Sequence, residues 1–165
     1  MDFNISFKLN ANTIEISKIK KSIDKSNLNN TNVINLKELK FSTSYIEENK
    51  ELVSSFLNVT IIKYNITTCV INSNDIAVNV LSLINTWEHI KKIIFKEKKS
   101  LSFDIFMRIL DNRYIEEIEC EHMDKYLIER LDVNKSIVVK TRSKIENTSS
   151  FMIINSLKSF SDIYY

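Results

Sequence analysis

The stretch Ile66-Thr67-Thr68-Cys69-Val70-Ile71 places apolar side chains at its first, fourth and sixth positions, and the same phrase recurs along the chain. Clear copies are LKELKF at 36–41, IKKIIF at 90–95 and IEEIEC at 115–120. The starts of the four copies are 30, 24 and 25 residues apart. Weaker copies are ANTIEI at 11–16 and VNKSIV at 133–138. Because a period of about 20 to 50 residues is the signature of stacked structural units, this phrase decides the predicted fold.

The segments between the phrases space their apolar residues by three and four positions, as on one face of a helix. They run over residues 45–57, 76–87, 103–110 and 123–131. Within each phrase the fourth and sixth side chains point inward along a strand, and the intervening side chains point outward. Each unit is therefore predicted to contain a strand, a turn and a helix, and the units stack because one alone cannot bury its apolar face.

The extended phrase at 66–76 resembles the strand segment of the leucine-rich repeat family. That segment reads L-x-x-L-x-L-x-x-N/C-x-L, and ITTCVINSNDI at 66–76 follows it with Ile or Cys in place of Leu. The copy at 36–46 follows it too, except that Ser44 stands at the asparagine position. The resemblance covers residues 11–140 and implies that Asn74 hydrogen-bonds the backbone of neighbouring turns. Lys98 and Met123 occupy that position in the next two copies, so an unbroken row of asparagines is not expected.

We therefore expect an α/β fold: a short leucine-rich-repeat-like solenoid with parallel strands on one face and helices on the other. The chain is expected to form a single domain over residues 1–165. Residues 1–10 are predicted to form an N-terminal cap strand, and residues 11–142 about five to six strand-helix repeats. Residues 143–150 read as a loop, and residues 151–165 as a C-terminal capping helix. The alternative is a compact α+β domain whose alternating strands and helices imitate a repeat.

The composition excludes several classes of enzyme. The chain contains neither glycine nor proline, although average usage of roughly 7% and 5% predicts about 12 and about 8 of them. Glycine-rich phosphate loops and the G-x-S-x-G nucleophile elbow both require glycine. Abundant asparagine is expected to fill tight turns, as at 27–32 and 72–74, because it tolerates the left-handed region better than other residues with a side chain. The bias toward Ile, Asn and Lys is typical of an AT-rich genome.

Charge and targeting signals predict a soluble, cytoplasmic protein. The net charge is +2, which does not by itself demand nucleic acid. The start MDFNISFKL lacks the basic and apolar regions of a secretory signal. No apolar run approaches the roughly 18 residues of a membrane span. Cys69 and Cys120 are expected to be small buried residues without a disulfide, in a reducing compartment.

The outward positions of the phrases define the predicted binding surface, which the resemblance assigns to a protein partner. These positions are Lys37, Glu38, Lys40, Thr67, Thr68, Val70, Lys91, Lys92, Ile94, Lys96, Glu116, Glu117, Glu119 and Glu121. The residues predicted to contact the partner are Lys37, Glu38, Lys40, Thr68, Lys91, Lys92, Lys96, Glu116, Glu117 and Glu119. Three basic-to-neutral rows followed by an acidic row would form a polarised face that orients a partner of opposite gradient. The alternative is that these are ordinary solvated strand residues.

The predicted function is a non-catalytic interaction scaffold with no cofactor, no metal and no membrane partner. His89 and His122 are the only imidazoles; His89 falls at a helix end, and the spacing in CEH at 120–122 does not match a zinc signature. The alternative function is an RNA- or ribosome-associated factor that uses lysine clusters at 18–25 and 91–99. Self-association is a further expectation, because no polar capping unit is evident at the C-terminal edge.

Overall fold

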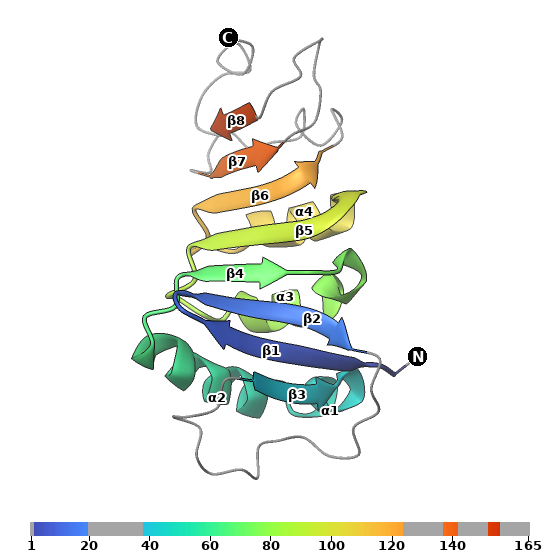
Figure 1. Ribbon diagram of the computed structural model, residues 1–165, viewed down its shortest axis with the longest axis vertical. Helices are drawn as coiled ribbons and strands as arrows, with labels where there is room; N and C mark the ends of the chain where they lie inside the picture. Colours follow the sequence, from blue (N-terminus) through green and yellow to red (C-terminus); the bar gives the residue numbers. More distant parts are fainter. Residues whose placement is uncertain (1, 20–37, 124–136, 142–151, 156–165) are drawn as a thin grey trace.

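The computed structural model describes residues 2–19, 38–123, 137–141 and 152–155, and shows an α/β fold in which helices cover one face of a single sheet (Figure 1). The strands are β1 (Asn4–Asn10), β2 (Thr13–Ile19), β3 (Glu38–Ser42), β4 (Thr68–Ile71), β5 (Lys92–Ser100), β6 (Glu117–His122), β7 (Val138–Thr141) and β8 (Met152–Asn155). The helices are α1 (Thr43–Glu48), α2 (Lys50–Lys63), α3 (Ala77–Ile84) and α4 (Phe103–Leu110), with a 3-10 turn η3 (Asn74–Ile76).

The sheet has eight strands in the order β3-β1-β2-β4-β5-β6-β7-β8. The central run is parallel: β2 pairs with β4, β4 with β5, β5 with β6, and β6 with β7. The two ends are antiparallel, with β1 between β2 and β3 at one end and β8 beside β7 at the other. Consecutive parallel strands from β4 to β6 are connected through helices on the same face, as the repeated phrase predicts.

The parallel strands align the repeated phrase position by position. The fourth positions form the column Ile14, Cys69, Ile93, Ile118 and Val139, and the sixth positions form the column Ile16, Ile71, Phe95, Cys120 and Thr141. All ten side chains are buried. The predicted inward direction of the fourth and sixth positions is therefore confirmed for β2, β4, β5 and β6, and the weak copy at 11–16 belongs to the ladder.

Two copies of the phrase lie elsewhere than predicted. The copy at 36–41 contributes β3, which runs antiparallel to β1 at the edge of the sheet instead of joining the parallel run. Its Leu39 and Phe41 are nevertheless buried, because alternation selects a face of the sheet and carries no strand direction. At the other end, Val139 and Thr141 are aligned with Ile118 and Cys120, so the last copy occupies 136–141 and not 133–138.

The two predicted end caps also differ from the structure. The N-terminal segment forms a strand, β1, but β3 flanks it, so β1 does not close the end of the sheet. The predicted capping helix at 151–165 is wrong for Met152–Asn155, which form β8 antiparallel to β7. Its adjacent isoleucines favour a strand over a helix. The remaining residues of that segment, the predicted loop at 143–150 and the predicted helical segment 124–131 lie outside the described residues.

A ladder of backbone hydrogen bonds connects the turns that precede the parallel strands. The Asn12 carbonyl accepts the Thr67 and Thr68 amides at 3.2 and 3.3 Å. The Thr67 carbonyl accepts the Lys91 and Lys92 amides at 2.8 and 3.2 Å, and the Lys91 carbonyl accepts the Glu116 and Glu117 amides at 2.8 and 3.1 Å. The Glu116 carbonyl accepts the Val138 amide at 2.9 Å. We call this series the turn ladder; it satisfies turn groups that burial would otherwise penalise.

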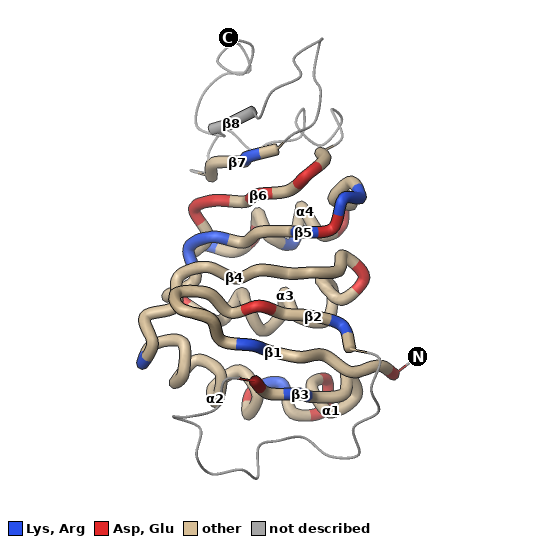
Figure 2. The backbone as a smooth tube through the Cα atoms, in the orientation of Figure 1, with Lys and Arg blue, Asp and Glu red and all other residues tan. Residues whose placement is uncertain are grey.

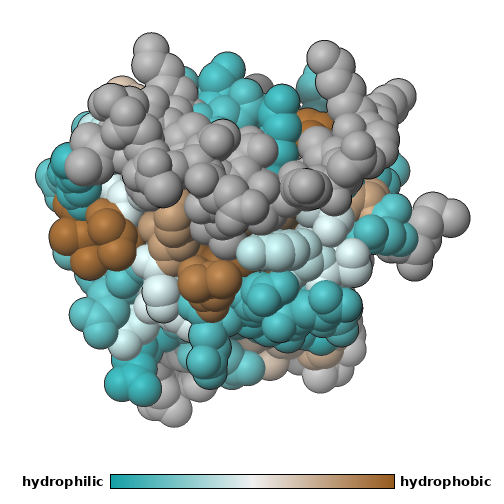
Figure 3. Space-filling view, turned by 90° about the horizontal axis from the view of Figure 1, so that it is seen from below, coloured by the Kyte–Doolittle hydropathy of each residue, from teal (hydrophilic) through white to brown (hydrophobic). Residues whose placement is uncertain are grey.

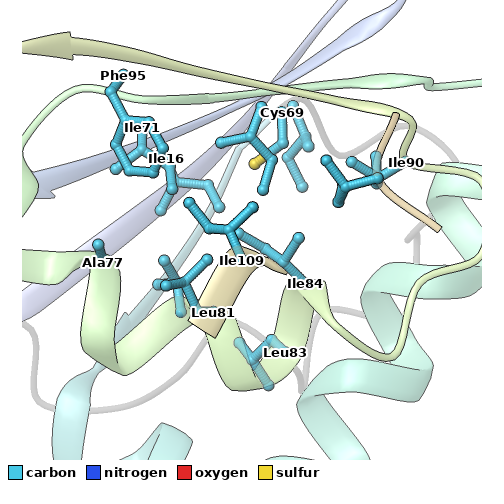
Figure 4. Close-up of a cluster of buried hydrophobic side chains, with 14 of the residues drawn as sticks. Ile16, Cys69, Ile71, Ala77, Leu81, Leu83, Ile84, Ile90, Phe95 and Ile109 are labelled. Carbon is cyan, nitrogen blue, oxygen red and sulfur yellow. The ribbon is translucent and has the colours of Figure 1, made fainter. Parts of the chain in front are cut away.

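The apolar core lies between the sheet and the helices (Figure 4). Side chains from the strands, including Cys69 and Phe95, face Leu81 and Ile84 of α3 and Ile109 of α4. Trp87 is fully buried, and its indole N–H donates to the Ser54 carbonyl of α2 at 3.2 Å. Among the helices that the structure describes, none combines the length and apolar character needed to cross a membrane.

Serine side chains start two of the helices directly after strands. Ser42 Oγ accepts the Tyr45 amide at 3.1 Å at the start of α1, and Ser102 Oγ accepts the Ile105 amide at 3.3 Å at the start of α4. Positive φ angles occur at Ala11 and Asn65, at 46° and 51°. Asn65 fits the expectation that asparagine fills left-handed positions in a glycine-free chain, whereas Ala11 does not.

Asn112 supplies a second connection between turns. Its Oδ1 accepts the Tyr114 and Ile115 amides at 2.7 and 3.1 Å, and its Nδ2 donates to Asn85 Oδ1 at 2.7 Å. The resemblance assigned such a role to Asn74, whose Oδ1 is buried without a hydrogen-bond partner among the described residues.

Replacing Asn112 with Ala should lower the free energy of unfolding by about 2 to 4 kcal/mol, because three hydrogen bonds are lost and two buried amides lose their acceptor. Urea denaturation measures the change. The matched control is Asn12→Ala, since the Asn12 side chain is exposed and the turn ladder uses only its carbonyl; its effect should stay within about 0.5 kcal/mol. Equal losses in both variants would contradict a structural role specific to Asn112.

Candidate interaction surface

One face of the sheet carries helices, and no helix or strand within the described residues covers the other (Figure 1). We call this other side the open face. Its central row crosses seven strands through Glu38, Lys8, Glu15, Val70, Ile94, Glu119 and Lys140, each aligned with the next. The neighbouring row toward the turn ladder runs through Thr13, Thr68, Lys92, Glu117 and Val138. Side chains from strands far apart in sequence therefore form one surface.

An ion network joins three strands of the open face. Lys92 Nζ lies 2.7 Å from Glu117 Oε2 and 3.1 Å from Glu119 Oε2, and Lys140 Nζ lies 2.8 Å from Glu117 Oε1. The side chains of Lys92 and Glu117 are 26% and 23% exposed. The network thus connects β5, β6 and β7 in a partly desolvated setting, where ion pairs are worth more than on a fully exposed surface.

Two members of the network, Glu117 and Lys92, have shifted pKa values. Partial burial acts to raise the pKa of Glu117, but hydrogen bonds from Lys140 and Lys92 outweigh it and hold that pKa below the ordinary value of 4.5. The hydrogen bond to Glu117 raises the pKa of Lys92 above 10.5 against the opposing effect of burial, and Glu119 adds to the increase. These residues therefore remain charged throughout the neutral range.

The centre of the open face is uncharged, and we call its residues Thr68, Val70 and Ile94 the neutral strip. Val70 on β4 is 7% exposed, Ile94 beside it is half-buried, and Thr68 lies in the neighbouring row. A carboxylate follows on either side in the central row, Glu15 on β2 and Glu119 on β6. The Glu15 carboxylate accepts a hydrogen bond from the side-chain Nδ2 of Asn72 at 2.6 Å. It forms no ion pair with the cations of the described residues.

Six of the ten predicted contact residues lie on the open face along strands, although not as one continuous group. Thr68, Lys92, Glu117 and Glu119 come from three adjacent strands, while Glu38 and Lys40 lie on β3 beyond β1 and β2. The Glu38 side chain accepts the Ser6 hydroxyl at 2.7 Å. Lys96 follows the last aligned residue of β5 and has no register partner in β4 or β6. Lys91 and Glu116 precede their strands and belong to the turn ladder, where the Lys91 ammonium lies 5.7 Å from the centre of the Tyr114 ring. Lys37 lies outside the described residues.

The predicted charge gradient across the face is not present. The row at 36–41 is separated from β4 by β1 and β2, which introduce Lys8 and Glu15. The acids of β6 are flanked by Lys92 on one side and Lys140 on the other (Figure 2). Cations and anions therefore alternate across the outer strands, and the neutral strip lies between them.

Sequence reasoning missed Lys8, Glu15 and Lys140 as surface residues. Lys140 follows from the corrected final copy at 136–141, where it occupies the fifth, outward position. Glu15 holds the same position in the weak copy at 11–16 and could have been selected from it. Lys8 belongs to a strand outside the repeat, and the phrase carries no signal for it.

Both thiols are buried, and a pocket on the helix side is small. Cys69 and Cys120 face the core, and burial raises the pKa of the Cys69 thiol and raises that of Cys120 to about 11, so both stay protonated. A shallow pocket between α1 and α3, bordered by Glu47 and Asn79, has a volume of about 120 Å³. Typical ligand pockets have about 300 Å³ or more.

The helix side of the molecule also exposes apolar side chains. The largest exposed ones on helices are Leu52, Val59, Ile62, Val78, Phe103 and Met107, from α2, α3 and α4. At the end of the molecule formed by β3 and α2, hydrophobic side chains alternate with hydrophilic ones (Figure 3). These side chains are distributed over three helices, whereas the neutral strip of the open face is continuous from β4 to β5.

Comparisons of the chain with protein-family models, with curated proteins and with solved structures find no match.

Replacing Glu117 with Gln should cost about 1 to 2 kcal/mol of unfolding free energy at pH 7, because two lysines lose their shared anion. The folded-state pKa of Glu117 is lowered, so its stabilising effect is complete above its unfolded value and disappears as the pH falls through the folded value. Urea denaturation of both proteins at pH 7 and pH 3 should show the gap closing at the lower pH. A gap that is constant with pH would contradict the ionic origin of the effect.

Proposed function

We propose that the protein is a non-catalytic interaction module that binds a protein partner through its open face. The observation that carries this proposal is the neutral strip of Thr68, Val70 and Ile94, in which Val70 and Ile94 lie between the carboxylates of Glu15 and Glu119. An apolar centre with a polar rim is the usual anatomy of a protein interface. Side chains from β2, β4, β5 and β6 form one surface because these parallel strands are paired in register.

The charges define the chemistry of a matching partner. Glu15 and Glu119 are three strand spacings apart in the central row, which corresponds to about 14 Å. A complementary partner has an apolar group between two cations at that separation. An extended segment in which a cation, an apolar residue and a second cation occupy alternate positions spans about 13 to 14 Å, since one strand residue advances about 3.4 Å.

The face also disfavours partners with the wrong charges. An acidic group placed over Glu15 would meet a carboxylate that has no cationic partner among the described residues. Bringing like charges together at an interface costs roughly several kcal/mol, which excludes competing partners that place an acidic group there. The paired charges of Lys92, Glu117 and Lys140 contribute mainly by fixing the shape of the rim.

The function is tested by capture from native lysate with the purified, tagged full chain, followed by quantitative mass spectrometry at low and moderate salt. The double variant Ile94→Lys with Glu119→Lys should reduce recovery of a stoichiometric partner at least about tenfold, because it charges the apolar centre and reverses the rim. The matched control is Leu52→Lys with Glu51→Lys, which makes the same chemical changes on the exposed side of α2.

The comparison of the two variants decides the proposal. Circular dichroism and urea denaturation first confirm that both remain folded. Loss of the partner in the open-face variant alone supports the proposal. Equal recovery with both variants, or loss only in the α2 variant, overturns it and moves the interaction to another surface.

A further inference from the structure

Four residues of β5 form an irregular segment between two points of pairing with β6, beyond the last residue aligned with β4. β4 is aligned with β5 only up to Phe95, and β6 is aligned with it up to Phe95 and then again at Ser100. The intervening residues Lys96–Lys99, here called the lysine arm, have no register partner in the described strands. The ribbon and the charge-coloured tube show this end of β5 projecting from the sheet, with lysines at its tip (Figures 1 and 2).

The arm presents three cations and turns its one acid inward. The Glu97 carboxylate accepts the Asn74 amide, and its side chain is 26% exposed. The Lys99 side chain is 82% exposed and lies 3.7 Å from Glu97. Lys96 and Lys98 are exposed and form no ion pair with the described residues. The contrast is with Lys92 on the same strand, whose charge is already neutralised by two glutamates.

This arrangement divides the lysine cluster that the sequence suggested. Lys92 and Lys99 are seven residues apart on the same strand and are separated by the register irregularity after Phe95. Lys91 belongs to the turn ladder at the opposite end of the strand, and Lys92 belongs to the ion network. Within this cluster, the exposed lysines are therefore confined to the arm.

We propose that the lysine arm binds the phosphate backbone of single-stranded RNA, independently of the protein-binding function of the open face. Lysine ammonium groups act as point charges that contact phosphate without reading base sequence. The arm projects from the sheet, and the side chains of Lys96, Lys98 and Lys99 are exposed on it. A flexible single strand can bend around such a projection and bring successive phosphates to its cations, whereas a flat membrane surface meets only its tip.

The test measures binding of a fluorescent 12-nucleotide oligouridylate to the full chain over a range of salt concentrations. Each neutralised phosphate of a single strand contributes about −0.7 to the slope of log affinity against log salt, so three lysines should give a slope of about −2. The variant with Lys96, Lys98 and Lys99 replaced by Gln should lose most of this slope. The matched control replaces Lys8, Lys50 and Lys63 by Gln; all three are exposed, and the net charge falls equally.

The outcomes distinguish RNA binding by the lysine arm from nonspecific electrostatic attraction to the whole protein. A slope near −2 that is lost only in the arm variant supports the proposal. An equal decrease in both variants, or no binding of the oligouridylate at low salt, overturns it. Stronger arm-dependent binding to vesicles containing phosphatidylserine than to the oligouridylate also overturns it, because the arm would then recognise a membrane surface. Capture of the protein partner by the open face is unaffected by any of these results.

Discussion

The arrangement of the molecule depends on the turn ladder, in which one backbone carbonyl before each strand accepts amides from the next turn. The chain has no glycine to permit unusual turn geometries and no proline to fix them. Regular turns are instead secured by hydrogen bonds such as those from Lys91 and Lys92 to the Thr67 carbonyl. Because the side-chain direction alternates with each residue, a slip of one position would turn Ile93 and Phe95 outward. The ladder thus determines which residues form the core and which form the open face.

Much of this fold could be predicted because buried apolar residues recur in the sequence at the spacing of a strand or a helix. The fourth and sixth positions of the phrase had to be apolar to reach the core, and Cys69 and Ile118 are found there. The helical spacing over 103–110 likewise predicted α4 at its observed bounds. Strand direction was not predictable for the copy at 36–41, because the same alternation serves a parallel or an antiparallel strand. The C-terminal segment was misassigned at β8 because short apolar runs fit either a strand or a helix.

The outward direction of individual surface residues could be predicted from the sequence, but their arrangement relative to one another could not. Thr68, Lys92 and Glu119 occupy outward positions as the phrase requires. Their electrostatic meaning depends on which strands are neighbours, and β1 and β2 intervene where the sequence suggested direct succession. Lys140 illustrates the same limit, because its pairing with Glu117 follows only from a register that the weak final copy did not reveal. Which side chains pair across strands depends on the tertiary structure, whereas the inward or outward direction of a side chain follows from the local alternation along its strand.

The sequential pairing of β4, β5, β6 and β7 has a consequence for how this chain can change during evolution. β5, β6 and β7 each pair with the strands before and after them in the sequence, so their contacts within the sheet are those of nearest neighbours. In such arrays stability is approximately a sum of unit and interface contributions. Gain or loss of one whole unit of about 25 residues, the spacing between the phrases at 66, 90 and 115, would therefore alter only the interfaces at the site of the change. Length in whole units is then an evolvable property of the fold, whereas insertion of a single residue within a strand is not.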